Sequence, residues 1–114
     1  MDYTDRLRCL SLNDARFAEG SVEPVDVESL DLEPKTLELV RLAALVAVGG
    51  AVPSYGAQAD SAVTAGATAA EIVDVLVGVI PVVGLPCVVA AAPKLALALG
   101  YDFDDDPLES RPAE

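Results

Sequence analysis

The side chains that could do chemistry in this chain lie on two neighbouring segments. The first segment has Glu38 and, one helical turn later, Arg41; the second has Ser54, Tyr55 and Gln58. A carboxylate can transfer a proton, a guanidinium can bind an anion, and hydroxyl and amide groups can orient a ligand. We therefore take Glu38 as the candidate acid/base, Gln58 as an orienting group, and the other three as candidates for binding a small anionic ligand.

Each of these residues also has a structural interpretation. Glu38 and Arg41 can form an ion pair within one helix, and the ring of Tyr55 can fill a helix junction. Gln58 can be a hydrogen-bonded contact between helices, since its amide exchanges no proton near neutral pH. An enclosed polar cavity of roughly 300 Å³ or more that contains Gln58 and either Glu38 or Arg41 favours an enzyme or a ligand binder. A site filled by Tyr55 and valine side chains favours the structural interpretation.

Helix start and stop signals place these residues on helices. Pro34 in a first turn and a pair of glycines at Gly49 and Gly50 bound the helix with Glu38, and Gly66 ends the one with Gln58. The sequence predicts one or two short helices before Gly20, followed by an acidic arm. The other predicted helices are residues 30–49, 53–66, 68 to about 83, and about 85–99.

An apolar hairpin follows these helices. Thr68 and Glu71 form a capping box that opens it, and no charged residue occurs from Val75 to Pro93. Two prolines and the glycine Gly84 interrupt this run, so we expect two short buried antiparallel helices rather than a membrane span. One charged residue lies at each end of this run, Asp74 directly before it and Lys94 directly after it. We expect them to pair with each other or across subunits.

The predicted helices together make an all-α, single-domain bundle of about six helices. Hydrophobic residues make up 53% of the 114 residues and aromatics 4%, so Ala, Val and Leu must form the core. Helices that are apolar on nearly every side need more burial than one small chain supplies, which predicts a homo-oligomer. We divide the chain into N-terminal helices and acidic arm (1–29), a helical domain (30–101) and an acidic tail (102–114).

Charge and cysteine usage narrow the function classes. The net charge of −12 argues against a nucleic-acid partner, which requires cationic contacts. The charged N-terminus has no secretory signal, so we expect a cytoplasmic protein with Cys9 and Cys87 as free thiols. Cys87 lies among Val and Ala, which is typical of a small buried hydrophobic residue. We expect no metal and no cofactor.

The order of several short motifs resembles the carboxymuconolactone decarboxylase family, which includes the alkylhydroperoxidase D-like proteins. The resemblance covers about residues 30–101. It implies an all-α fold, trimeric or hexameric rings, and sites at helix and subunit junctions. The motifs are LEPKTLELVRLA at 32–43, the segment 62–68 ending in AGAT, Glu71-Ile72, Val75-Leu76 and Gly84-Leu85-Pro86.

The resemblance also shows which groups this chain lacks. The positions of the redox branch's CxxC pair and His are occupied here by Ala51, Ser54 and Gln58. Disulfide exchange needs a thiolate, so a peroxidase is disfavoured. The decarboxylase branch also has a His where Gln58 stands. Three hypotheses follow: a non-redox lyase for a small anionic carboxylated or lactone substrate, a catalytically silent oligomeric binding or scaffold protein, and a thiol peroxidase.

Overall fold

The computed structural model describes residues 2–12 and 30–101, and the chain divides into two compact units, residues 1–31 and 32–114. Helix α1 (Tyr3–Ser11) belongs to the first unit. The Asp2 carboxylate caps it by accepting the Asp5 backbone N–H at 2.9 Å. A helix before Gly20 is thereby confirmed. The predicted acidic arm and acidic tail lie outside the described residues.

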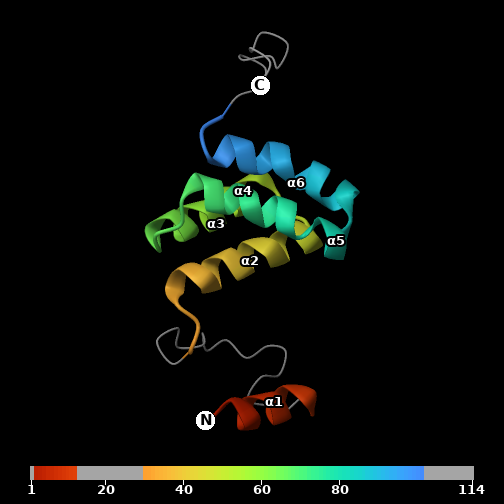
Figure 1. Ribbon diagram of the computed structural model, residues 1–114. Coiled ribbons are helices and arrows are strands. Elements are labelled where there is room, and N and C mark those ends of the chain that lie inside the picture. Colours follow the sequence, from red (N-terminus) through yellow and green to blue (C-terminus); the bar gives the residue numbers. More distant parts are fainter. Residues whose placement is uncertain (1, 13–29, 102–114) are drawn as a thin grey trace. The chain divides into compact units, whose positions relative to one another are not determined.

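The second unit is a bundle of five helices (Figure 1). The described residues form helices and connecting turns, which confirms the all-α fold class. Six helices lie within the described residues, in agreement with the predicted number of about six, but α1 belongs to the other unit. Their bounds are α2 Pro34–Val48, α3 Val52–Thr64, α4 Ala69–Gly78, α5 Ile80–Val83 and α6 Leu85–Ala98.

The predicted helix boundaries are set by glycines and by the capping box. Gly66, with φ of 106°, turns the chain out of α3, in the left-handed region that favours glycine. Thr68 Oγ1 then accepts the Glu71 N–H at 3.1 Å, and Glu71 Oε1 accepts the Thr68 N–H at 3.0 Å. Two backbone donors at the start of α4 are satisfied by these bonds, so the predicted capping box is confirmed.

The predicted helix from Thr68 to about Val83 is two helices. The chain leaves α4 after Gly78, and α5 begins at Ile80. Pro81 has no backbone N–H to continue the hydrogen bonds of α4, which explains the break. Gly84, with φ of 89°, then directs the chain into α6, and this confirms the predicted turn.

The core of the bundle lies around α3, which packs against both α2 and α6. Its alanines Ala59 and Ala62 are almost fully buried, and Ala91 of α6 is buried as well. Small side chains allow the helices to approach closely, and branched residues from α2, α4 and α6 fill the remaining space. The largest fully buried side chains are Tyr55, Leu42, Ile72, Leu95 and Val46.

One chain buries the apolar hairpin only in part. Helix α5 has no buried residue, and Val82 is 85% exposed. Val77, Leu85 and Val89 are also exposed, and their burial against another copy stays a prediction. Among the described residues, no helix combines the length and apolarity needed to cross a membrane.

The predicted pairing of Asp74 with Lys94 within the chain is wrong. Lys94 Nζ donates instead to the Gly50 carbonyl at 2.8 Å, across 44 residues of sequence. Gly50 lies just after the C-terminus of α2, where a cation interacts favourably with the helix dipole. This bond fixes the turn between α2 and α3, while Asp74 stays exposed on α4.

Candidate functional site

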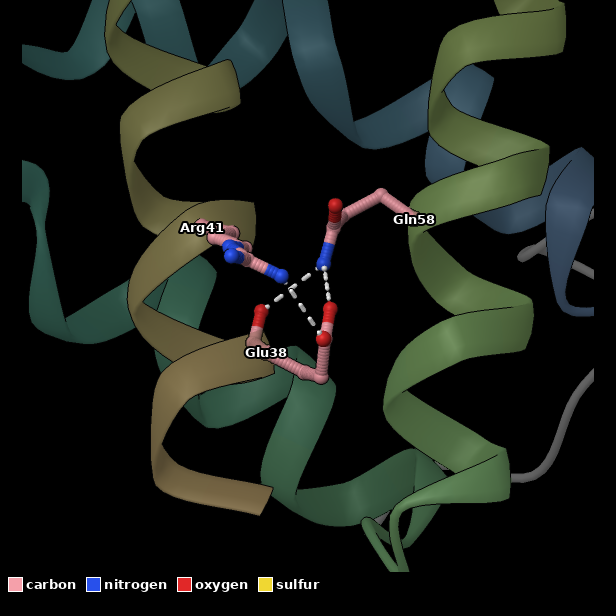
Figure 2. Close-up of polar contacts among 3 residues, drawn as sticks. All are labelled: Glu38, Arg41 and Gln58. Carbon is pink, nitrogen blue, oxygen red and sulfur yellow. Dashed lines mark hydrogen bonds and ion pairs between the residues drawn. The ribbon is translucent and has the colours of Figure 1, made fainter. Parts of the chain in front are cut away.

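The candidate residues Glu38, Arg41 and Gln58 form one hydrogen-bonded cluster between α2 and α3 (Figure 2). Gln58 Nε2 donates to Glu38 Oε2 at 2.8 Å and to the Glu38 carbonyl oxygen at 3.0 Å. Arg41 Nη1 donates to Glu38 Oε1 at 3.1 Å. Both carboxylate oxygens of Glu38 therefore have a partner, one from each helix.

The helical period places this cluster at the edge of the core. Leu37 and Leu42 beside it on α2 are buried, as is Ala59 on α3. The Glu38 side chain is 16% exposed and that of Arg41 is 45% exposed. Glu38 is thus held as a shielded carboxylate, whereas part of the Arg41 guanidinium faces water. The predicted i,i+3 ion pair is confirmed, and pairs of this kind contribute about 0.2–0.5 kcal/mol.

A hollow of about 430 Å³ lies beside this cluster and is open to solvent. We call it the α2/α3 hollow. Its volume and the presence of Gln58 and Arg41 agree with the prediction. The hollow is open and half of its lining residues are apolar, so the predicted enclosed polar cavity is not found. Arg41 is the one charged residue in its lining, and Glu38 lies behind Arg41 and Gln58. The lining residues are Arg41, Ala44, Leu45, Val48, Ser54, Ala57, Gln58 and Ser61.

The structure brings Ser54 to this hollow but not Tyr55. Ser54 and Gln58 are one turn apart on α3 and both line the hollow. The Tyr55 side chain is 1% exposed, and its hydroxyl donates to the Leu45 carbonyl oxygen at 3.4 Å. Burial raises the pKa of the Tyr55 hydroxyl, and the nearby Cys87 raises it further. Tyr55 therefore fills the helix junction from the core side.

Neither cysteine lines the α2/α3 hollow. Cys87 is half-buried and borders a separate cavity of about 140 Å³ that Tyr55 and Lys94 also line. Cys9 belongs to the other unit. Ala51 precedes the first residue of α3, and Ser54 lies in its first turn. These are the two positions of the CxxC pair in the redox branch, and both lie at the start of this helix.

Sequence reasoning missed the apolar wall of the hollow. Ala44 and Val48 follow Arg41 at intervals of three and seven residues, which places them on its face of α2. That spacing was a usable signal. Within residues 2–12 and 30–101, no group of three or more Cys, Asp or Glu side chains is arranged to hold a metal ion.

Comparison with protein-family models gives one finding. The carboxymuconolactone decarboxylase family model matches residues 12–96, which include all of α2 to α5 and most of α6. The match begins before residue 30, so part of the predicted N-terminal arm belongs to the family region. Comparison with curated proteins and with solved structures gives no match. Because the family model spans most of the 114 residues, this chain belongs to the carboxymuconolactone decarboxylase family.

Proposed function

We propose that this protein is a non-redox lyase that acts on a small anionic carboxylated or lactone substrate in the α2/α3 hollow. The observation that carries the proposal is the cluster itself. A partly exposed guanidinium lines a hollow of about 430 Å³, and a shielded carboxylate is held directly behind it. Anion binding and proton transfer both need groups of these types at such a site.

Arg41 is the group proposed to bind the substrate carboxylate. Its ion pair with Glu38 uses Nη1, at 3.1 Å, and the rest of the guanidinium has further N–H donors. The pair joins neighbouring turns of one helix and is partly exposed, so it is weak. A substrate carboxylate can therefore replace Glu38 as the partner of Arg41 at little energetic cost.

Glu38 is the group proposed to transfer a proton. When Arg41 turns to the substrate, Oε1 loses its donor, while Gln58 still holds Oε2 at 2.8 Å. The free oxygen can then take a proton from a substrate carbon beside a carbonyl group. The electron pair of that C–H bond forms a C=C bond as the C–O bond at the next carbon breaks, and the Glu38 carboxyl gives the proton to the leaving oxygen. Gln58 acts as a positioning residue in this scheme, and the Ser54 hydroxyl is a donor for a substrate oxygen.

The second candidate is a catalytically silent binding or scaffold protein that forms a trimer or hexamer. Two observations favour it. Glu38, Arg41 and Gln58 bond to one another without a ligand. Val82 and Val89 of the hairpin are exposed apolar side chains that a neighbouring copy would cover. The third candidate, a thiol peroxidase, has less support because Ser54 and Gln58 replace a thiol and an imidazole. A cytoplasmic location agrees with all three.

The test is a screen of the purified full chain with small lactones and carboxylated enol compounds, followed by NMR detection of substrate loss. Glu38→Gln should abolish turnover, and Arg41→Gln should raise KM at least tenfold. The matched controls are Asp60→Asn on α3 and Arg8→Gln on α1, both exposed positions outside the lining of the hollow.

Three results would count against the lyase. Equal loss of activity in the control variants would show that the cluster has no special part in the reaction. A stable ring in sedimentation experiments, with no turnover of any compound and no change in the NMR signals of α2 and α3, would favour the silent protein. Peroxide reduction that depends on Cys87 would favour the peroxidase.

A further inference from the structure

A second hollow lies on another part of the bundle, between α4 and α6. Its volume is about 610 Å³, which is within the usual range for small-molecule sites. These two helices contact each other in the bundle, and small residues facing the space between them leave it unfilled. Ala70 lies on α4, and Ala92 and Ala96 lie one turn apart on α6. We call this space the α4/α6 groove.

The lining of this groove is apolar except at one side. Leu95 and Leu99 contribute alkyl surface from α6. Asp74 is the one charged residue in the lining, and it is exposed on α4. Within the described residues Asp74 forms no ion pair and no side-chain hydrogen bond. A carboxylate beside an apolar trough complements a ligand that has an apolar body and a positive charge.

Tyr101 supplies a second feature that suits a cation. Tyr101 lines the same groove, and the residue is about half exposed. The Tyr101 backbone N–H donates to the Ala96 carbonyl at 2.9 Å, so the residue is held at the C-terminal end of α6. Aromatic faces attract ammonium groups, and helix C-termini also favour positive charge. An aromatic ring and a carboxylate therefore border one apolar space.

We propose that the α4/α6 groove binds an amphipathic amine, with the alkyl or aryl body in the trough and the ammonium group beside Asp74 and Tyr101. The proposal does not depend on the lyase function, because the groove shares no lining residue with the α2/α3 hollow. The net charge of −12 adds a long-range attraction for cations. An anion of the same shape should be excluded by Asp74.

The experiment compares octylamine, octanol and octanoate as probes of the full-length protein, by isothermal titration and amide NMR shifts. Octylamine should bind most tightly and shift the signals of α4 and α6, and octanoate should bind most weakly. Asp74→Asn should weaken octylamine binding about fivefold, as expected for loss of a partly exposed ion pair, and leave octanol binding unchanged. Asp60→Asn removes the same charge from α3 and should have little effect.

A second variant tests the position of the apolar body. Ala96→Leu should fill the trough and reduce the binding of octylamine and octanol together. Equal affinity for all three probes, or equal effects of Asp74→Asn and Asp60→Asn, would overturn the proposal. So would sedimentation showing that a second copy covers the groove and that octylamine does not displace it.

Discussion

The α2/α3 hollow and the α4/α6 groove are built from the same helical bundle but differ in how charge is placed. In the hollow, Arg41 faces the open space and Glu38 is held behind it by two donors. In the groove, the carboxylate of Asp74 faces the open space without a partner among the described residues. One region therefore suits anions and the other cations, although the chain as a whole is strongly acidic.

The two regions also differ in their relation to the core. Leu95 and Leu76 line the groove and belong to the buried core, so the floor of the groove is core surface. The polar side chains of the hollow lie at the edge of the core. Local hydrogen bonds fix the hollow, whereas the packing of whole helices fixes the groove. Substitutions at the two regions should therefore differ in their effect on global stability.

The largest effect is expected from Leu95→Ala. Leu95 is 1% exposed, and removing a buried leucine side chain costs about 2–5 kcal/mol because it leaves a cavity. Chemical denaturation of the variant measures this loss. Leu97→Ala, on the same helix at a position that is 56% exposed, is the control and should cost much less. Similar losses for both would show that α6 does not pack as described.

A smaller effect is expected from Glu38→Ala, which removes the centre of the polar cluster. The carboxylate accepts one bond from Gln58 and one from Arg41, so we expect a loss of about 1–2 kcal/mol in the free energy of unfolding. Asp74→Ala, which removes the acid of the groove, should cost less than about 0.5 kcal/mol. A reversed order in urea unfolding would contradict the contrast between a paired and an unpaired carboxylate.

Thr68→Ala should destabilise the α4/α6 groove more than the α2/α3 hollow, since Thr68 caps α4, which forms one wall of the groove. Loss of an N-cap costs about 1 kcal/mol. Hydrogen exchange should become faster in the first turns of α4 and change little in α2 and α3. Thr36→Ala in the first turn of α2 makes the same chemical change outside the capping box and is the control.

The smallest effect concerns the contact between α2 and α4. The pKa of Glu71 lies below its ordinary value, mainly because the Thr68 backbone N–H donates a hydrogen bond to its carboxylate. Lys35 lowers this pKa as well, since its Nζ is 3.1 Å from Glu71 Oε2. The unfolded chain then binds this proton at higher pH than the folded chain does. The ionised Glu71 carboxylate therefore stabilises the folded chain at pH values above the ordinary pKa of a glutamate. This contribution is lost as the pH falls through the lower pKa that Glu71 has in the folded chain.

Glu71→Gln should remove that part of the acid dependence. Thermal unfolding of the variant and of the wild type should converge as the pH is lowered below about 4. Asp60→Asn, which changes an exposed acid elsewhere, should leave the difference between neutral and acidic pH almost unchanged. A constant gap between wild type and Glu71→Gln at every pH would contradict the assignment.

The features that sequence predicted correctly depend on neighbouring residues. The capping box of Thr68 and Glu71, the turn at Gly84 and the pair of Glu38 and Arg41 each involve groups within three residues or a single backbone conformation. Such signals need no knowledge of the fold. The all-α class and the order of the helices followed from them.

The features that sequence missed depend on how whole helices rotate and pack. Tyr55 is adjacent to Ser54, but neighbouring positions on a helix point about 100° apart, so one fills the core and the other lines the hollow. Lys94 bonds to Gly50 rather than to Asp74, because packing brings together residues that are far apart in the chain. Val82 on α5 is exposed because no other helix of the described chain packs over its side chain, and this also depends on how the helices pack.

The amide at position 58 also determines how the α2/α3 hollow responds to physiological acidity. Histidine is the side chain that ordinarily changes its charge between about pH 5 and 8, and this chain contains none. The amide of Gln58 donates its bonds to Glu38 without any change of its own charge. Position 58 therefore adds no pH-dependent charge to the hollow, whereas an imidazole at the same position would make the affinity for a ligand vary between compartments of different acidity.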